Sequence, residues 1–394
     1  MLYNPAHNGY NASVNNRIKG RNEMIYLDYA ANTPAREEVL NIFAEVARQY
    51  VANPNSPHSM GREAAQKLAE YTGQIKRILG AQAFEAVYTS GASESNNLAI
   101  KGIAKKYGRF GRHMITTYLE HSSVNGAMEA AIQDGFEVDY VDITKEGLVD
   151  LEHLRELLRP DTVLLSVCHV DSEIGLTQQI GEIGGLLADY PNCRFHVDAT
   201  QSVGKIPVPL KNIDLLTFAP HKFYGLNGCG VLLKNPEVQL EPLIHGGIST
   251  TPYRSGTPAL ALIASTAAAL ELAWADMQKN LEHVRNLNQI LRTALAKQQS
   301  IRINSTENSV PHILNLSMPG ANTQSLLAEL EKEGFILSAK SACCAPTAIS
   351  RPVFALTRDK KAALSTLRVS LSHLTTEEDV QAFLQSLAVC MNRL

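Results

Sequence analysis

The fold is decided by two stretches, FHVDATQ at residues 195–201 and FAPHK at residues 218–222. Each begins with apolar residues, as a buried strand does, and each ends in polar side chains. The first reaches Asp198, and the second reaches His221 and Lys222. Because ligands bind beyond the carboxyl ends of the strands in an open parallel sheet, we expect these side chains to meet at one site.

An aspartate and a lysine at neighbouring strand ends are the pair that pyridoxal phosphate (PLP) requires. The lysine amine forms a Schiff base with the cofactor aldehyde. A buried carboxylate keeps the pyridine nitrogen protonated, so the ring can accept electrons from a substrate carbanion. The sequence therefore predicts a PLP enzyme built on Asp198 and Lys222. Taken singly, the aspartate could be a turn cap and the lysine a solvated side chain.

Strand and helix patterns alternate on both sides of these stretches. Helical patterns fill several of the gaps between strands, notably residues 62–79, which precede Gly80. Such alternation predicts an α/β fold with a mostly parallel mixed sheet and helices on both faces. The predicted strands are residues 86–89, 113–118, 136–143, 162–170, 194–197, 215–218 and 230–233.

The length of 394 residues indicates two domains. After about Pro258 the pattern changes to a long helical stretch through Gln299, followed by a mixed segment to the end of the chain. We expect a large domain over residues 33–275. Residues 1–32 and 276–394 are expected to form a smaller α+β domain.

Composition excludes several classes of partner. The chain has 36 Lys and Arg against 39 Asp and Glu, without a run of like charge that would bind nucleic acid or a membrane surface. Residues 1–23 are polar and lack the apolar core of a secretory signal, and no window is expected to reach the length of a membrane span. We therefore expect a cytoplasmic protein that binds neither nucleic acid nor membrane.

The six cysteines are too few and too unevenly spaced for a disulfide framework. Three of them, Cys168, Cys193 and Cys229, lie in or beside apolar runs and are predicted to be core residues. Cys343 and Cys344 lie in a segment of small residues that is typical of a loop, where a thiol can move and react. The alternative for them is an inert pair or a pair oxidised together.

A candidate phosphate-binding segment lies earlier in the chain than Asp198 and Lys222. TSGASESN at residues 89–96 follows a predicted strand and opens a helix, so backbone N–H groups and hydroxyls near Ala92 and Ser93 can bind an anion. By itself such a stretch is more often an N-cap. Together with Asp198 and Lys222, it predicts the phosphate subsite.

In these features the chain resembles the cysteine desulfurases, PLP enzymes of the class V aminotransferase group with the fold-type I architecture. The resemblance implies conversion of L-cysteine to L-alanine, with the sulfane sulfur left as a persulfide on an enzyme cysteine. It runs nearly end to end through the motifs YLDYAA (26–31), TSGASES (89–95), EH (120–121), HVDSEIG (169–175), DATQS (198–202), HK (221–222), RSGT (254–257), SAC (341–343) and Arg368.

The resemblance also implies a role for each matching residue around the cofactor. Lys222 would hold PLP and move the Cα proton, and Asp198 would pair with the ring nitrogen. Gln201 would bond the ring hydroxyl, and His121 would stack on the ring and assist proton transfer. The alternative for His121 is a structural histidine. The phosphate would lie on Ala92, Ser93, His221 and, from a second subunit, Thr257, which makes the expected protein a homodimer.

For the substrate, the resemblance implies that Arg368 binds the carboxylate and that Cys343 attacks the sulfur as a thiolate. A surface ion pair is the alternative for Arg368. Ser172 stands where the family usually has an asparagine, so that contact with cofactor and substrate would be lost or bridged by water. Ala219 replaces a usual serine, and residues 246–251 lack the family's polar and acidic side chains. These departures indicate a divergent member.

Two alternatives remain open from the sequence. A selenocysteine lyase or a carbon–sulfur β-lyase of the same fold would keep Lys222, Asp198 and Arg368 but would need no persulfide carrier. An inactive sulfur-relay or scaffold paralogue would explain the altered cofactor contacts. The spacing from Cys343 to Arg368 resembles the longer-loop branch of the family, which delivers sulfur to partner proteins. The acceptor protein itself, whether it serves iron–sulfur cluster biogenesis, tRNA modification or DNA modification, is not specified by the sequence.

Overall fold

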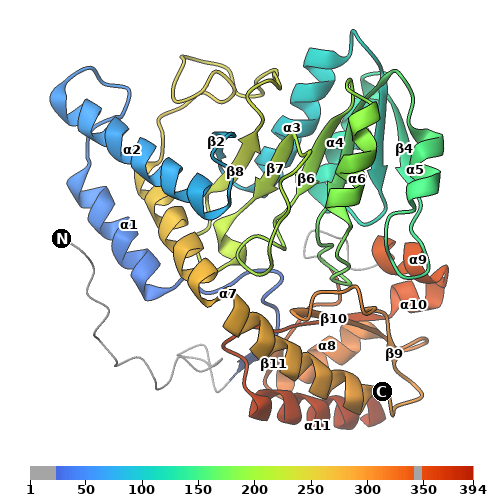
Figure 1. The fold of residues 1–394 in the computed structure, drawn as a ribbon. Helices are drawn as coiled ribbons and strands as arrows, with labels where there is room; N and C mark the ends of the chain where they lie inside the picture. Colours follow the sequence, from blue (N-terminus) through green and yellow to red (C-terminus); the bar gives the residue numbers. More distant parts are fainter. Residues whose placement is uncertain (1–23, 341–347, 394) are drawn as a thin grey trace.

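A computed structural model describes residues 24–340 and 348–393. Within these residues one large sheet has the strand order β2-β8-β7-β6-β5-β3-β4 (Figure 1). Its strands pair in parallel except β8, which is antiparallel to both β2 and β7. The strands are β2 (Glu85–Thr89), β3 (His113–Thr117), β4 (Glu137–Val141), β5 (Thr162–Cys168), β6 (Arg194–Asp198), β7 (Leu215–Phe218) and β8 (Gly230–Lys234). The mostly parallel mixed sheet expected from the sequence is confirmed.

Successive residues of the central strands serve two separate cores. Leu164 of β5 and Leu215 of β7 pack on the side of α3 and α4. Their chain neighbours Leu165 and Leu216 pack on the opposite side, together with residues of α1, α2, α6 and α7. Because side chains alternate between the two faces of a strand, a run of apolar residues is what a sheet covered on both faces requires.

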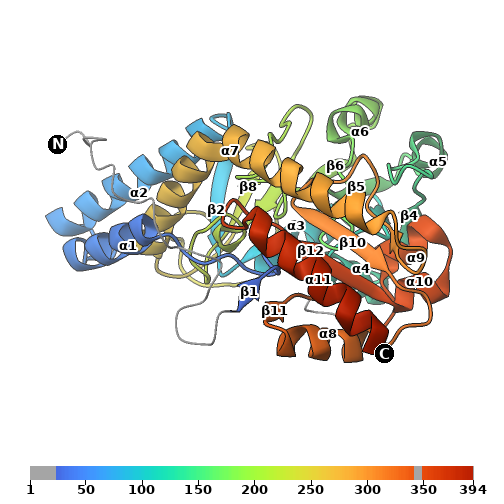
Figure 2. The ribbon, with the colours of Figure 1, turned by 90° about the horizontal axis from the view of Figure 1, so that it is seen from below.

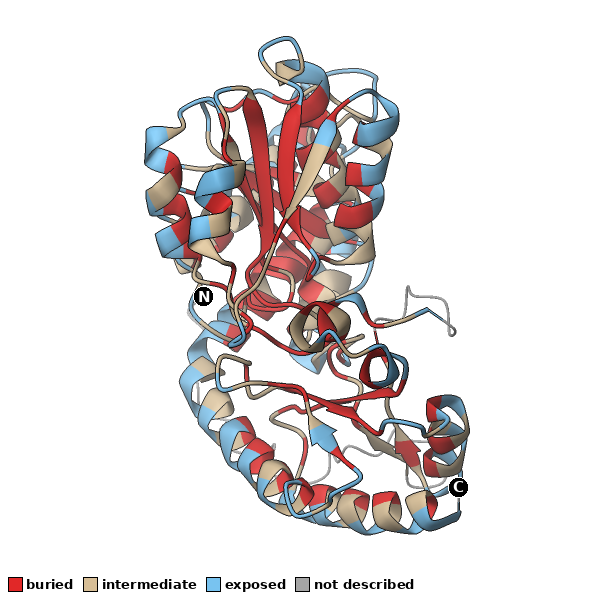
Figure 3. Cartoon of the chain, turned by 90° about the vertical axis from the view of Figure 1, so that its right-hand side faces the viewer, coloured by how far each residue is buried: buried red, intermediate tan, exposed pale blue. Residues whose placement is uncertain are grey.

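Helices cover both faces of the large sheet, and Figure 3 shows the buried strands between helices whose outer surfaces are exposed. The short 3-10 turn η2 (Pro220–Lys222) follows β7, and η1 (Leu187–Asp189) follows α6. The helices are α1 (Glu37–Gln49), α2 (Ser59–Ile78), α3 (Ala92–Tyr107), α4 (Ser122–Gln133), α5 (Leu151–Leu157), α6 (Ile180–Leu186) and α7 (Leu260–Leu295).

The helix α7 corrects one expectation. It contains a window apolar and long enough, by composition alone, to cross a membrane, although the sequence analysis expected none. Half of that window is buried inside the protein. Its N-terminal half packs against α1 and α2, with Ile263, Ala267 and Leu270 in the shared core (Figure 1). These contacts account for its apolar composition as that of a core helix.

A second, smaller unit follows α7. Within the described residues, a sheet of order β12-β10-β9 is antiparallel, and β1 pairs in parallel with β11. The core here joins the C-terminal half of α7 to this sheet, and Figure 2 shows α8 and α11 beside them. The elements are β1 (Ile25–Tyr26), β9 (Arg302–Ile303), β10 (Ile313–Ser317), α8 (Thr323–Lys332), β11 (Phe335–Ile336), α9 (Arg351–Thr357), α10 (Lys360–Leu364), β12 (Thr366–Ser370) and α11 (Glu377–Arg393).

The predicted division at residues 275 and 276 falls inside α7, which runs without a break from Leu260 to Leu295. That boundary stays a prediction. The cysteines expected in the core, Cys168, Cys193 and Cys229, are buried and free. Residues 1–23 and the segment with Cys343 and Cys344 lie outside the described residues.

Candidate functional site

A cavity of about 380 Å³ lies at the carboxyl ends of the central strands. It draws its lining from strand ends of the large sheet, from the start of α3 and from β12 of the small sheet. The sequence-predicted residues that line it are Ala92, Ser93, His121, Ser172, Asp198, Gln201, His221, Lys222 and Arg368. The central expectation, that Asp198 and Lys222 meet at one site, is therefore met by the geometry.

Asp198 ends β6 and is held by neutral donors. Its Oδ1 accepts from the backbone N–H of Thr200 at 3.0 Å, and its Oδ2 accepts from Asn96 Nδ2 at 2.7 Å. Asn96 lies on α3, one turn after Ala92, and is fully buried. Because a carboxylate can only accept, the amide must present its nitrogen to Asp198. Both carboxylate oxygens are therefore fixed in direction by uncharged donors.

The same amide connects Asp198 to His121. Asn96 Nδ2 also donates to Ser123 Oγ at 2.9 Å, and Ser123 Oγ lies 2.8 Å from His121 Nδ1. His121 caps α4, since its Nδ1 accepts from the backbone N–H of Ser123 at 3.2 Å. A backbone N–H can only donate, so Nδ1 carries the lone pair and the neutral ring holds its proton on Nε2. Burial lowers the pKa of His121 below its ordinary value of 6.5, which favours this neutral form.

Lys222 closes η2, and its amine rests on backbone carbonyls from the loop after β1. Its Nζ donates to Ala30 O at 2.9 Å and to Ala31 O at 2.6 Å. The neighbouring His221 also lines the cavity, and burial together with the charge of Lys222 lowers the pKa of His221 to about 4. A neutral histidine therefore stands beside a lysine whose amine is positioned in the cavity.

The start of α3 forms another part of the lining, through Ser90, Gly91, Ala92 and Ser93. The strand β8 approaches this turn closely: a Cβ on Gly230 would lie 2.3 Å from the carbonyl carbon of Gly91. Only glycine permits that approach. The positive end of the helix dipole thus faces the cavity, as an anion subsite requires.

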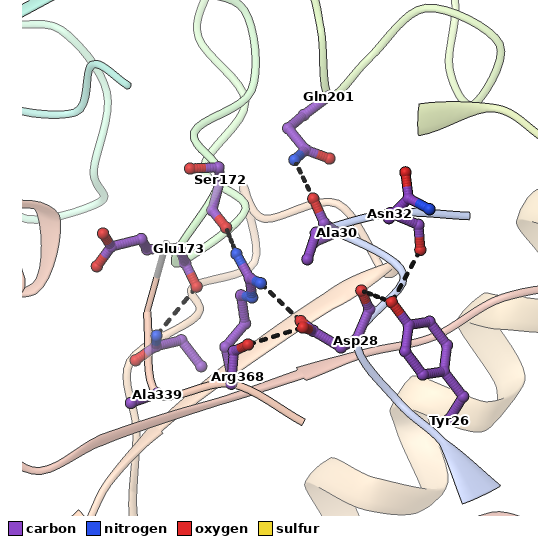
Figure 4. A network of polar contacts seen from close by, with 12 residues as sticks. Tyr26, Asp28, Ala30, Asn32, Ser172, Glu173, Gln201, Ala339 and Arg368 are labelled. Carbon is purple, nitrogen blue, oxygen red and sulfur yellow. Dashed lines mark hydrogen bonds and ion pairs between the residues drawn. The ribbon is translucent and has the colours of Figure 1, made fainter. Parts of the chain in front are cut away.

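Arg368 lies on β12 and is only 1% exposed. Figure 4 shows its guanidinium between Ser172 and Asp28. Its Nη1 donates to Ser172 O at 2.8 Å and its Nη2 to Asp28 Oδ1 at 2.7 Å. Ser338 Oγ donates to the other oxygen of Asp28 at 2.7 Å. Arg368 is thus a buried ion-pair partner as well as a cavity residue, and the predicted surface alternative does not apply.

Glu120, next to His121, is a buried acid. Its Oε1 accepts from the backbone N–H of Cys168 and from Thr117 Oγ1, both at 2.8 Å. Its Oε2 is buried and has no hydrogen-bond partner within the described part of the chain. Burial raises the pKa of Glu120 from 4.5 to about 8, so the side chain carries a proton at neutral pH.

Among the described residues, the predicted Thr257 does not line this cavity. Thr257 lines a different groove beside Asn53, whose Nδ2 donates to Thr257 Oγ1 at 3.4 Å. Cys343 falls outside the described residues. The phosphate contact assigned to Thr257 therefore cannot come from the same subunit in this arrangement.

Sequence reasoning missed the partners that orient the site. Asp28 and Ala30 lie in a quoted motif but had no assigned role, and neither did Asn96 or Lys205. A signal existed for Asn96, because an asparagine in the first two turns of a helix on the same side as Ala92 is placed to face the anion end. Asp28 gave no comparable signal, because its partner Arg368 is 340 positions away.

The comparisons with known proteins agree on one family. The family model described as aminotransferase class-V matches residues 25–383. A cysteine desulfurase IscS from Dictyoglomus turgidum is 35% identical over 375 residues, covering 94% of this chain and 95% of the relative. Another, from Methylococcus capsulatus, is 37% identical over 366 residues and covers 90% of this chain and 89% of the relative.

Solved structures are similar as well. A NifS-like protein matches with a TM-score of 0.87 and 30% identity, covering 94% of this chain and all of its own. SspA in complex with cysteine matches with a TM-score of 0.77 and 31% identity over 88% of this chain and 98% of its own. The expected fold-type I architecture is thereby confirmed. The chain belongs to the cysteine desulfurase family of the class-V aminotransferases.

Proposed function

We propose that this protein is a PLP-dependent cysteine desulfurase. L-cysteine and the thiol of Cys343 are converted to L-alanine and a Cys343 persulfide, so the sulfur lost by the substrate is the sulfur gained by the enzyme. An acceptor protein then receives that sulfur. The observation that best supports the proposal is that Asp198 and Lys222 line one cavity with a helix N-terminus and Arg368.

The residues of the cavity fit PLP. Lys222 supplies the amine that would attach it, and Asp198 supplies an anion that accepts from two neutral donors. The turn of Gly91, Ala92 and Ser93 offers an anion site at the start of α3. When bound, PLP supplies an electron sink for charge that develops at the substrate Cα.

Arg368 is suited to bind the substrate carboxylate. Within the described residues, the guanidinium contact to the Ser172 carbonyl is neutral and the one to Asp28 is ionic. A substrate carboxylate can replace the neutral contact while Asp28 keeps the guanidinium in place. Ser172 takes part through its backbone carbonyl. The replacement of the family's usual asparagine by serine at this position therefore does not alter the contact with Arg368.

Two side chains can move protons in the cavity. Lys222 presents an amine held on two carbonyl oxygens, and His121 presents an Nε2–H because its Nδ1 accepts from Ser123. A neutral histidine with this tautomer donates rather than accepts at Nε2. We therefore assign Lys222 to transfer of the substrate Cα proton. We assign His121 to donation of the proton on its Nε2 to the substrate.

The protein is proposed to be a homodimer in which Thr257 of one subunit completes the phosphate site of the other. Thr257 lies beside Asn53, and the large apolar side chains of Val51 and Ile248 on the adjoining segments are exposed. Such exposure is typical of a surface covered by another protein. Light scattering of the purified protein tests this, and a monomer would contradict it. A cytoplasmic location stays a prediction.

The test of function is mass spectrometry of the protein after treatment with L-cysteine. We expect one additional sulfur atom on Cys343. Cys343→Ser should lose L-alanine formation by at least about a hundredfold, because no thiol is left to accept the sulfur. Lys222→Ala should lose the visible absorption of the bound cofactor.

Cys344→Ser is the matched control, because it changes the neighbouring thiol in the same segment. It should keep alanine formation and the added sulfur on Cys343. If Cys343→Ser forms L-alanine from L-cysteine at the wild-type rate, the desulfurase assignment is wrong. If the wild-type protein binds no PLP, the cofactor assignment is wrong as well.

A further inference from the structure

Gln201 lines the cavity and holds its amide in one defined direction. Its Nε2 donates to Ala30 O at 2.8 Å, a contact visible in Figure 4, and its Oε1 accepts from Lys205 Nζ at 3.0 Å. The side chain is 5% exposed. Ala30 O is also an acceptor for Lys222, so the amide and the central lysine share one carbonyl.

Both contacts oppose rotation of the amide by 180°. The rotated amide would set its oxygen against the Ala30 carbonyl and its NH₂ against the Lys205 amine. One N–H of Gln201 is used by Ala30 and its oxygen faces the Lys205 amine, so the second N–H is the donor that remains for a ligand in the cavity. An oxygen acceptor is therefore favoured at this point of the cavity.

The backbone fixes Lys205 for this contact. Its N–H donates to Ser202 O at 3.0 Å, closing a turn directly after Gln201. Gly204 within this turn has φ +76, and a Cβ there would lie 2.7 Å from Phe223 Cβ. Any other residue would be strained and would collide, so the turn that carries Lys205 requires this glycine.

Lys205 is half-buried. It also lines a small cavity of about 20 Å³ with Tyr29, His312 and His373, enough space for about one water. Burial, then the charges of Lys222 and Arg368, lower the pKa of the Lys205 amine to about 7. The amine can donate to Gln201 whether it is charged or neutral, so the contact does not depend on titration.

We propose that Lys205 is a positioning residue that keeps Gln201 turned so that its amide N–H donates to the ring oxygen of PLP. This rests on the proposed function, because it assumes PLP in the cavity. Lys205 acts through Gln201: its amine contacts Gln201, and Gln201 would contact the cofactor.

A double-mutant cycle tests this. The dissociation constant of PLP is measured by dialysis for the wild type, Lys205→Met, Gln201→Ala and the double variant. The pH is set at 8.5, where an amine of pKa near 7 is mostly neutral and the lost charge has little effect. We expect Lys205→Met to weaken PLP binding about five- to tenfold in the wild-type background. In the Gln201→Ala background it should change binding by less than about twofold.

A second variant guards against a folding defect. Lys205→Gln keeps an N–H donor and should bind PLP within about threefold of the wild type. If Lys205→Met weakens binding by the same factor in both backgrounds, Lys205 does not act through Gln201 and the inference is overturned. If the wild type binds no PLP, the proposed function fails, and this outcome is distinct from an additive cycle in a protein that does bind it.

Discussion

The cavity has two walls that are built in opposite ways. The strand-end wall consists of Asp198 and His121. Each accepts from a backbone N–H two positions further along the chain, and Asn96 of α3 adds one longer-range contact to Asp198. The arginine wall consists of Arg368, Asp28, Ser172 and Ser338, whose contacts join residues 196 to 340 positions apart. One wall is set mainly by local structure and the other by the docking of distant segments.

The walls also differ in charge. Asp198 is held by neutral donors, so its negative charge is available to a cationic group that enters the cavity. Arg368 shares its positive charge with Asp28, so an anion that binds it competes with a carboxylate already present. The first arrangement favours tight pairing with a permanent occupant. The second weakens binding and suits a substrate that must enter and leave.

The largest effect is expected from breaking the arginine wall. Arg368→Met should lower kcat/KM for L-cysteine by about a thousandfold or more, because the substrate carboxylate loses the guanidinium that binds it. It should also lower the free energy of unfolding by about 3 kcal/mol, because Asp28 is left without its ionic partner. Steady-state kinetics and urea unfolding measure the two effects.

Asp28→Asn in the same protein separates stability from binding. The double variant should regain most of the stability, because no charge is left unpaired, and should remain inactive. Full activity in Arg368→Met would show that Arg368 serves only to hold the wall together. A double variant as unstable as Arg368→Met would show that Asp28 is not the partner that matters.

The difference between the walls explains what the sequence could predict. The strands of the large sheet were predicted to within a few residues, because each is a short apolar run bounded by turn residues. Asp198 and Lys222 follow two of these runs, so their meeting at the carboxyl edge followed from sheet geometry. Parallel strands bring such ends together whatever the rest of the chain does.

The arginine wall could not be predicted in this way. Every residue of β12 is buried, including Arg368, although arginine is among the side chains least often buried. Its burial depends on Asp28, which is brought beside β12 by pairing of distant strands. No local pattern records that pairing. The orientation of Gln201 by Lys205 was missed for a related reason, because it depends on a turn and not on a periodic element.

A smaller effect is expected beside the strand-end wall, from Glu120→Gln, because Glu120 is the chain neighbour of His121. Burial raises the pKa of Glu120 to about 8. Between its unfolded value of 4.5 and this value the folded state binds the extra proton, so the free energy of unfolding falls as pH rises from about 5 to 8. Glutamine keeps the acceptor for Thr117 and Cys168 but does not titrate. The variant should match the wild type near pH 5 and exceed its stability by roughly 1–3 kcal/mol at pH 8.

Urea unfolding at both pH values measures this difference. Glu129→Gln is the control, because Glu129 is an exposed glutamate on α4, the next helix. It should leave the pH dependence of the wild type unchanged. Equal slopes for Glu120→Gln and the wild type would show that Glu120 is ionised in the folded protein.

The smallest effect is expected from Ser338→Ala, which removes one hydroxyl donor from Asp28 and leaves Arg368 in place. The free energy of unfolding should fall by about 1 kcal/mol, and KM for L-cysteine should change by less than about threefold. Ser265→Ala is the matched control, because that hydroxyl bonds Leu262 O in its own helix. It should cost less than about 0.5 kcal/mol. If the two variants lose the same stability, the arginine wall depends on the Arg368–Asp28 pair alone and Ser338 adds nothing to it.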